Sequence, residues 1–351
     1  MMRTTVLSVV AAVALSVSPA GAERFHCDTV RGESPYANTA TGLHDHLRYA
    51  PEATDEPVRE FSAFAAAFDG PDDDNGDGRP DQTGNPSWVA YHLIGVGPNG
   101  DGRYVEPDVS VEAPRPWYRS VDLAHLWTDR PGISAARVDD SYSGVGRTWN
   151  RGHLAMADHA QRIGPEASCN THVFWNASPQ AADFNQGPWL HLETYTAALS
   201  NMDGEIWIVA GPVFDRRPLI NIAAPGEVPV AVPHAFFKLI VREVGASIEV
   251  RALVFEHPSL GRHGYAEPEP GVARGWVNCR RASAAHHTYA PAGNLVSLAE
   301  LERRTGLRFL RAHPDYARIA SVRPQSLWDV PERYWSGFLC GGQNDGGPSN
   351  D

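Results

Sequence analysis

The sequence predicts an α+β fold with a central antiparallel sheet flanked by helices. Three apolar runs rich in β-branched and aromatic residues, at 205–214, 232–243 and 247–256, follow one another as successive antiparallel strands do. Residues 189–199 have helical composition before these strands, and 297–305 form a second helical segment after them. The 351 residues include 28 Pro and 32 Gly, which favours many loops and excludes a helical bundle. This length fits one large core, or a core domain with appendages.

Residues 1–22 predict a secretory signal peptide rather than a folded element. Arg3 supplies a positive start, 6–17 is a short apolar stretch, and 20–22 is an Ala-Gly-Ala cleavage site. An uncleaved anchor is the alternative, but the apolar stretch is too short to span a bilayer. No later segment is apolar enough to do so. We therefore expect cleavage after Ala22, release to the periplasm or the medium, and no membrane association afterwards.

The remaining chain is acidic. Removing residues 1–22 removes one Arg and no acidic residue, so 29 basic (30 − 1) and 42 acidic side chains remain, a net charge of −13 (29 − 42) with His neutral. This balance is typical of a soluble exported protein. It argues against a protein that coats nucleic acid through a broad basic face. An enzyme that binds one or two phosphates locally remains compatible with it.

Four cysteines remain after signal removal, and none belongs to a C-x-x-C pair: Cys27, Cys169, Cys279 and Cys340. An even count in an exported chain favours two disulfides, with three possible connectivities that the sequence leaves open. Cys27 and Cys340 lie near the two ends, so they could tie the termini to the core. A Cys-ligated metal is not expected.

Residues 23–84 are predicted to be an N-terminal extension. In 58–68 the large apolar residues recur every three or four positions, which predicts a helix. The acidic segment that follows resembles the start of a calcium loop, with Gly78 at the sixth position and Gly84 where the twelfth position usually has Glu. Its predicted Ca²⁺ ligands are Asp73, Asn75, Asp77 and Asp81. A solvated acidic turn is the alternative.

The elements around the central strands are predicted in order along the chain. Residues 88–94 are rich in aromatic and β-branched residues and predict a strand, and 95–148 is loop-rich. The 297–305 helix has a capping pattern and ends at Gly306. Residues 311–351 form a C-terminal extension, whose end, rich in Gly, Asn and Asp, is predicted to be disordered.

Two short strands and a helix are predicted around the polar residues of interest. His153 lies where a short strand could end, and 173–176 is a second short strand. Pro188 suits a first helical turn, so the helix begins there and continues through 189–199.

The segment 150–153, Asn-Arg-Gly-His, contains the candidate catalytic base. Asn185 follows His153 by 32 residues, and Glu193 follows Asn185 by 8, or about two helical turns. A histidine can take a proton from water at neutral pH. The asparagine and the carboxylate can hold Mg²⁺ and its waters, and Arg151 can pair with a phosphate oxygen. This set suits phosphodiester hydrolysis.

Neighbouring histidines and tryptophans have simpler interpretations. His159, His172 and His191 lie near the set, but none has a spacing typical of zinc ligands on a helix. A zinc site is therefore not expected. Trp175 and Trp189 could stack on bases, but we predict that they pack in the core.

The chain resembles the DNA/RNA non-specific endonucleases of the ββα-metal superfamily, the group of Serratia nuclease and mitochondrial endonuclease G. The family's Asp-Arg-Gly-His motif corresponds to 150–153, its second-strand Asn with Pro-Gln to 176–180, and its metal Asn and helix to 185–193. Further matches lie at 88–91, 211–212, 232–238 and 298–307. The likeness covers about residues 85–310, which we predict to be the endonuclease domain, with a ββα-metal active site.

The resemblance implies roles for five residues. His153 would be the general base, Asn185 the direct Mg²⁺ ligand, and Glu193 the residue that orients a metal-bound water. Arg151 would stabilise the charged transition state, and Asn176 would support the site through hydrogen bonds. The implied substrates are DNA and RNA, cleaved to 5′-phosphate and 3′-hydroxyl ends. Mn²⁺ could substitute for Mg²⁺ at this site. The acidic loop adds a possible structural Ca²⁺, and no protein partner is predicted.

Two departures from the family pattern keep other functions open. Asn150 stands where the family has Asp, and Ala197 stands where the Serratia-type enzyme has Arg one turn after its Glu. Another cation would then bind phosphate, and the candidates are Arg119, Arg147 and Arg162. One rival is a calcium-stabilised extracellular binding module on a weakly active or inactive nuclease fold. The other is a phosphodiesterase acting on non-nucleic substrates.

Overall fold

The computed structural model describes residues 24–27, 44–52, 56–69, 83–107, 109, 111–112, 117, 135–143, 149–215, 219–257 and 291–336. Several predicted features lie outside these residues: the signal peptide, the acidic loop with Asp73, Asn75, Asp77 and Asp81, Cys279, Cys340, Arg119, Arg147 and the end of the C-terminal extension. Within the described residues, no helix has the length and apolar character needed to cross a membrane.

The main sheet has seven strands in the order β11-β10-β9-β8-β4-β3-β2, and every neighbouring pair is antiparallel. The strands are β2 (Val58–Glu60), β3 (Ala65–Phe68), β4 (Pro86–Ile94), β8 (Glu205–Val213), β9 (Ala235–Val244), β10 (Ser247–Glu256) and β11 (Leu295–Val296). The α+β class with a central antiparallel sheet is confirmed, as are the strands predicted at 88–94, 205–214, 232–243 and 247–256.

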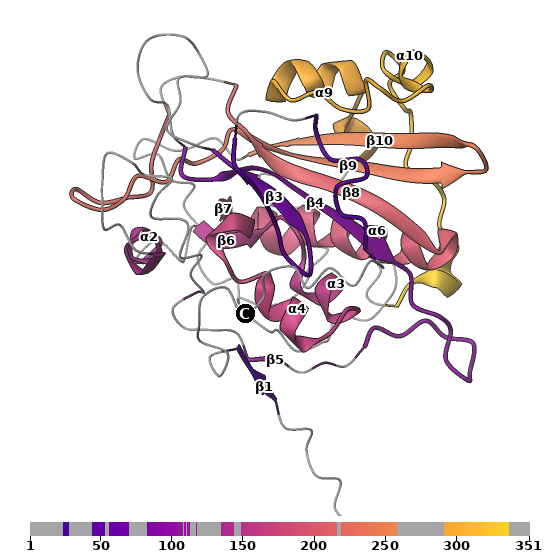
Figure 1. Cartoon of the computed structure of the whole chain (residues 1–351), viewed down its shortest axis with the longest axis horizontal. Coiled ribbons are helices and arrows are strands. Elements are labelled where there is room, and N and C mark those ends of the chain that lie inside the picture. The colour runs from indigo at the N-terminus through magenta and orange to yellow at the C-terminus, as the bar shows by residue number, and fades with distance from the viewer. Residues whose placement is uncertain are drawn as a thin grey trace, which may run out of the picture.

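The α-helices lie around the main sheet (Figure 1). They are α2 (Ala135–Ser141), α3 (Ala157–Gln161), α4 (Pro165–Asn170), α5 (Ala182–Phe184), α6 (Leu190–Asp203), α8 (Pro291–Asn294), α9 (Leu298–Thr305) and α10 (Tyr316–Ile319). Short 3-10 turns occur at Phe174–Asn176 (η2) and Glu332–Tyr334 (η4), and a π-helical turn, η3, spans Asn185–Trp189.

Two small sheets accompany the main one. Strand β6 (Trp149–His153) pairs antiparallel with β7 (Ala177–Ala181), and β1 (Phe25–His26) pairs parallel with β5 (Val111–Glu112).

Both faces of the main sheet are covered. On β9, Phe236 and Ile240 belong to one hydrophobic cluster, whereas Phe237 and Leu239 belong to another. The first face packs against α6 and the β6–β7 region, and the second against α9 (Figure 1). Because successive strand residues point to opposite faces, a strand buried on both faces shows no polar alternation. This explains the continuous apolar runs in the sequence.

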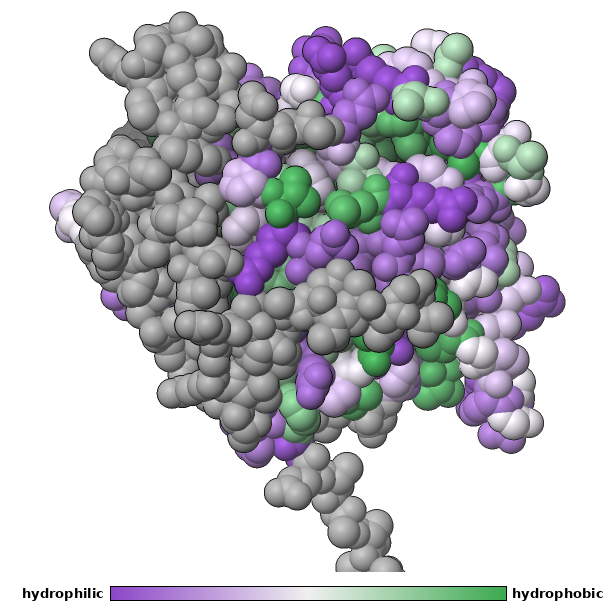
Figure 2. All heavy atoms as spheres, viewed as in Figure 1, coloured by the Kyte–Doolittle hydropathy of each residue, from purple (hydrophilic) through white to green (hydrophobic). Residues whose placement is uncertain are grey.

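The surface in the same view is mainly hydrophilic among the described residues. Figure 2 shows hydrophilic side chains over the α9 and α10 region, with apolar side chains in smaller groups. The large apolar residues that are exposed are scattered along the chain, for example Val105 and Val322. Isolated exposed apolar residues of this kind are ordinary for a folded domain.

Helix α9 begins and ends as predicted. The Ser297 hydroxyl accepts a hydrogen bond from the Glu300 N–H, and Gly306 closes the helix with φ +74°. Glycine adopts this left-handed conformation without the steric cost that a Cβ brings. The capping residues therefore set both ends of this helix.

The helix predicted at 58–68 is wrong. Residues 58–60 and 65–68 are the strands β2 and β3, with Ala65 in register with Ala90 of β4. All four residues of β3 are buried, so the strand lacks period-2 alternation and its apolar spacing imitates a helix. The predicted N-terminal extension thus contributes two strands to the main sheet.

Two further expectations are corrected. Residues 173–176, predicted as a strand, hold the 3-10 turn η2, and the strand comes directly after it as β7. Within the loop-rich stretch 95–148, β5 and the helix α2 are present. Helix α2 has only seven residues, which is too short for a periodic apolar pattern to be detected in the sequence.

A disulfide joins Cys27 to Cys169, with a Cα–Cα distance of 5.5 Å. It connects the N-terminal segment to α4 across 142 residues of sequence. Closing a loop of this length reduces the entropy of the unfolded chain and contributes roughly 5 kcal/mol in the chain-entropy model. One of the two expected disulfides is thus present, and it ties the N-terminal segment to the core.

Candidate active site

The candidate site lies on the β6–β7 pair and on the helical turns that follow β7. His153 ends β6 opposite Ala177, the first residue of β7. Gly152 pairs with Ser178, and a Cβ at Gly152 would come within 2.2 Å of the Gln180 Oε1 atom. A side chain at this position would displace the buried Gln180 side chain, which crosses the backbone just before His153.

Asn176 fixes the backbone after His153. Its side chain is fully buried, with 0% exposure. The Asn176 Oδ1 accepts a hydrogen bond from the Ala155 N–H at 2.7 Å, and Nδ2 donates to the carbonyls of Ala155 and Thr171, both at 2.9 Å. All these partners are main-chain groups that would otherwise be buried without partners. The amide thus holds the chain that follows the candidate base.

His153 is surrounded by aromatic rings. The His172 ring meets it edge to face at 4.8 Å between centroids, and Trp117 lies 4.9 Å away. Burial of the ring and the neighbouring His172 lower the pKa of His153 well below its usual value. The imidazole is therefore neutral at neutral pH and can accept a proton. Its buried Nε2 has no hydrogen-bond partner among the described residues.

The turn that carries Asn185 is irregular. Asn185 begins the π-helical turn η3, in which Gly187 has non-helical angles (φ −120°, ψ −107°) and precedes Pro188. Single π turns inside α-helices are frequent at functional sites. Asn185 is partly exposed, and the Trp189 Nε1 at the end of the turn donates to the His153 carbonyl at 3.1 Å. This hydrogen bond connects the turn to strand β6.

Glu193 lies in the first turn of α6 and is 4% exposed. Burial raises the pKa of Glu193 to about 7, against the opposing effect of Lys238 on β9. The Lys238 Nζ lies 3.7 Å from the Glu193 Oε1. The sequence interpretation missed Lys238, although one signal was available: it is the only charged residue in the otherwise apolar run from Ala235 to Val241.

Arg151 is already paired within the chain. Its guanidinium forms an ion pair with the Asp139 carboxylate on α2. It also lies 5.4 Å from the centre of the Tyr142 ring and 5.9 Å from that of Trp117. Asn150, in the position of the family's Asp, is in register with Gln180. Asp139, which the sequence interpretation missed, supplies a carboxylate to the Asn-Arg-Gly-His segment from outside it.

Arg162, one of the three alternative phosphate-binding candidates, is occupied structurally. Its guanidinium donates to both carboxylate oxygens of Glu106, at 2.7 and 2.5 Å. It also donates to the Ile94 carbonyl at 2.9 Å and the Ser200 hydroxyl at 2.8 Å. These bonds join α3, β4 and α6 and leave little capacity for a phosphate.

The neighbouring histidines form no metal site in the part of the chain that the structure describes. The His159 Nε2 donates to the Glu193 carbonyl at 3.1 Å, and the His172 Nδ1 donates to the Ser168 carbonyl at 3.2 Å. Trp175 and Trp189 are buried, which confirms their predicted place in the core.

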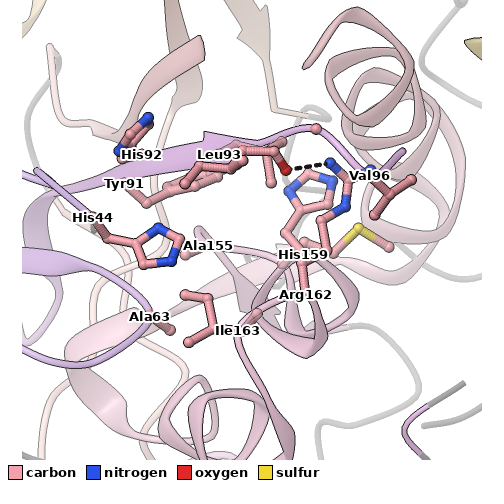
Figure 3. A pocket seen from close by; sticks show the side chains of 14 residues that line it. His44, Ala63, Tyr91, His92, Leu93, Val96, Ala155, His159, Arg162 and Ile163 are labelled. Carbon is pink, nitrogen blue, oxygen red and sulfur yellow. Dashed lines mark hydrogen bonds between the residues drawn. The ribbon is translucent and has the colours of Figure 1, made fainter. Parts of the chain in front are cut away.

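A cavity of about 140 Å³ lies between the end of β4 and the α3 region (Figure 3). Its walls include Tyr91 and the end of β4, together with His159 and Arg162 from α3 and its end. None of Arg151, His153 or Asn185 lines it. His159 lies between this cavity and Glu193, because its Nε2 holds the Glu193 carbonyl. The cavity is therefore separate from the residues that surround His153.

The donor set fits a hydrated divalent ion better than a soft metal. Asn185 offers a neutral oxygen, and the Glu193 Oε1 is a buried acceptor with no hydrogen-bond partner among the described residues. Mg²⁺ keeps several waters and needs only one or two protein oxygens, whereas Zn²⁺ favours three or four N or S ligands. These two residues would hold the ion and its water.

Comparisons with known proteins agree with the sequence motifs. Residues 79–315 match the family model of the DNA/RNA non-specific endonucleases. Mitochondrial endonuclease G of Bos taurus is 30% identical over 174 residues, 48% of this chain and 52% of that protein. Mitochondrial nuclease EXOG of Danio rerio is 28% identical over 241 residues, 65% of this chain and 56% of that protein. A nuclease of Nostoc sp. is 29% identical over 170 residues, 48% of this chain and 52% of that protein.

The chain spans about half the length of these relatives. A solved structure of an EndoG/EndoGI complex resembles it with a TM-score of 0.46 at 18% identity, over 74% of this chain and 86% of that chain.

Proposed function

Because the chain belongs to the DNA/RNA non-specific endonuclease family, we propose that it is an exported, Mg²⁺-dependent endonuclease of DNA and RNA. The observation that carries the proposal is the position of His153. A neutral imidazole ends β6, and the Trp189 hydrogen bond connects this strand end to the turn that carries Asn185 and to the helix of Glu193. A base beside oxygen ligands for a hard cation is the arrangement that phosphodiester hydrolysis requires.

In this reaction His153 takes a proton from the attacking water. Its lowered pKa keeps the imidazole unprotonated at neutral pH, so no deprotonation step precedes catalysis. The hydrogen bonds of Asn176 fix the backbone behind it. The water then attacks phosphorus in line with the leaving oxygen, which yields 5′-phosphate and 3′-hydroxyl ends.

Asn185 and Glu193 provide the metal site in this proposal. The side-chain oxygen of Asn185 would bind Mg²⁺ directly, and Glu193 would accept hydrogen bonds from its waters. When bound, Mg²⁺ stabilises negative charge on the phosphate and on the leaving oxygen as a Lewis acid. Mn²⁺ has the same preference for oxygen ligands and is an alternative ion.

In this proposal Arg151 binds the Asp139 carboxylate and a phosphate oxygen at the same time. Its ion pair with Asp139 orients the guanidinium, and its five N–H donors allow a phosphate oxygen to be bound at the same time. Asp139 thus provides a negative charge near the position where the family's Asp is replaced by Asn150.

Ca²⁺ binding by the acidic loop stays a prediction.

The proposal predicts cleavage by the purified protein beginning at residue 23. Supercoiled plasmid and a single-stranded RNA should both be cut with Mg²⁺ and should remain intact with excess EDTA. End-labelling should reveal 5′-phosphates, and His153→Ala should abolish cutting while the protein remains folded. Cleavage that persists at the wild-type rate in His153→Ala would contradict the role of the base.

Two other outcomes distinguish the rival functions. A clean wild-type protein that cuts no nucleic acid but binds Ca²⁺ would be a binding module on an inactive nuclease fold, which the replacement by Asn150 motivates. Cleavage of a chromogenic small diester without cleavage of DNA or RNA would indicate a phosphodiesterase. Export is tested by locating the protein in cell, periplasmic and medium fractions, with and without residues 1–22.

A further inference from the structure

We propose that Lys238 is a positioning residue of the active site, which holds the Glu193 carboxylate from the inner side and connects it to the main sheet. This inference rests on the proposed function, because it assigns a task to Glu193. Lys238 is 0% exposed and lies in the middle of β9.

The surroundings of Lys238 make its charge unusual. It is in register with Ala210 of β8 on one side and with Leu253 of β10 on the other. Both neighbours belong to the hydrophobic cluster on the face that packs against α6. A buried ammonium in an apolar ladder is strongly disfavoured unless a partner compensates for lost hydration. A methionine or leucine would fill this position at no such cost.

Glu193 is the compensating partner. The Lys238 Nζ lies 3.7 Å from its Oε1, and both atoms are fully buried without a hydrogen-bond partner among the described residues. The other titratable groups that influence Glu193 are Asp158 and Tyr91, and neither is cationic. Lys238 is thus the cation that acts on this carboxylate from the sheet.

Trp189 connects the same ammonium to the candidate base. The Lys238 Nζ lies 4.3 Å from the centre of the Trp189 ring, within range of a cation–π interaction. The Trp189 Nε1 donates to the His153 carbonyl at 3.1 Å. Lys238 therefore contacts the carboxylate of α6 directly and reaches the end of β6 through a single indole.

This arrangement links the Glu193 side chain of α6 to strand β9 of the main sheet. The His159 Nε2 holds the main chain of α6 at Glu193. Lys238 acts on the side chain, so the rotamer of the carboxylate is set by the rigid sheet. Groups that orient residues around a metal site usually change metal affinity or rate about 10- to 100-fold when they are removed. We expect an effect of that size on the Mg²⁺ midpoint and on kcat.

The test is a double-mutant cycle with Lys238→Met and Glu193→Gln in the full-length mature protein. Unfolding is measured without metal, and kcat, KM and the Mg²⁺ midpoint are measured on DNA. Arg242→Met is the matched control, because Arg242 is a cation of the same strand paired with Asp203 and Glu249 away from the site.

The positioning role predicts that Lys238→Met lowers kcat and raises the Mg²⁺ midpoint about tenfold or more, with little change in KM. In the Glu193→Gln background the same substitution should change neither. Arg242→Met should leave both unchanged. A Lys238→Met protein with lower thermal stability but wild-type kcat and Mg²⁺ midpoint would show a purely structural lysine and overturn the proposal.

Two further outcomes keep the test decisive. If Lys238→Met does not fold, adding Glu193→Gln should restore folding, because it removes the uncompensated charge; failure to restore it counts against the proposed contact. If the wild type cuts no nucleic acid, the proposed function fails. The unfolding cycle then still decides the contact, because additive effects of the two substitutions would exclude coupling.

Discussion

His153 and His92 occupy similar environments but differ in what their ring nitrogens do. Burial lowers the pKa of both histidines below the usual value. In His92, the Nδ1 accepts from the Asp45 N–H at 3.3 Å, and the Nε2 donates to Glu205 at 2.9 Å. The ring also stacks on Trp207 at 4.5 Å.

His153 has ring contacts but no such pair of hydrogen bonds. Its buried Nε2 has no partner among the described residues, and its neighbours are the rings of His172 and Trp117. A lowered pKa therefore accompanies burial at both places and does not identify a catalytic histidine. The distinguishing feature is a neutral imidazole whose Nε2 has no hydrogen-bond partner among the described residues, at a strand end that Trp189 links to the turn of Asn185.

The largest expected effect is the difference in kcat between His153→Ala and His92→Ala. His153→Ala should lower kcat by about 10²- to 10⁴-fold, because general-base catalysis typically contributes that much. His92→Ala should leave kcat of the folded protein near the wild-type value. It should instead lower the free energy of unfolding by about 1–3 kcal/mol through loss of buried hydrogen bonds and packing. Plasmid cleavage rates and urea unfolding measure the two effects, and equal loss of kcat in both variants would remove the distinction.

Asn176→Ala should lower both the free energy of unfolding and kcat. It removes three buried hydrogen bonds and leaves main-chain groups of Ala155 and Thr171 unpaired, at a cost of about 3 kcal/mol. Because Ala155 follows the base closely, kcat should also fall. Asn170→Ala is the matched control, since Asn170 accepts hydrogen bonds from Ser62 at the N-terminal segment. Loss of stability without loss of kcat in Asn176→Ala would limit its role to folding.

Acidification should destabilise the protein between about pH 6.5 and pH 4. Burial lowers the pKa of His46, His172 and His191 to about 4. In this window the unfolded chain binds protons that the folded chain does not, so the free energy of unfolding falls as the pH falls, by up to about 1.4 kcal/mol per pH unit for each histidine. Burial raises the pKa of Glu193, Asp158 and Asp203, which has the opposite sign and offsets part of this loss.

Urea unfolding at successive pH values measures this slope. His172→Phe should make it shallower, because the phenyl ring keeps the edge contact with His153 without a titrating group. An unchanged slope in that variant would contradict a neutral, buried His172 in the folded state.

The smallest expected effect concerns Asp139. Asp139→Asn removes a partly exposed ion pair and should cost about 1 kcal/mol or less. If Asp139 orients Arg151 for phosphate, kcat/KM should fall by several-fold, because small displacements of positioning groups lower rates. Asp140→Asn is the control on the same helix, since Asp140 is exposed. Equal rates in both variants would show that Arg151 is oriented by the rings of Trp117 and Tyr142 alone.

Local patterns predicted the parts of the fold that local forces control. The long strands β8, β9 and β10 and the capped helix α9 were found because their signals lie within about ten residues. Strands β2 and β3 were mistaken for a helix, since the burial of β3 on both faces depends on β4, which lies further along the chain. Helix α2 and strand β7, which begins just after the strand predicted at 173–176, likewise depend on partners that are distant in sequence.

The sequence by itself determined the fold class, the family motifs and the identity of His153, Asn185 and Glu193 as candidates, because residue type and spacing carry that information. Only the tertiary structure decided which charges meet. Asp139 reaches Arg151 from helix α2, and Lys238 reaches Glu193 from strand β9 of the main sheet. Electrostatic pairing depends on distance in space and on exclusion of water, and neither is encoded in the spacing of the residues along the chain.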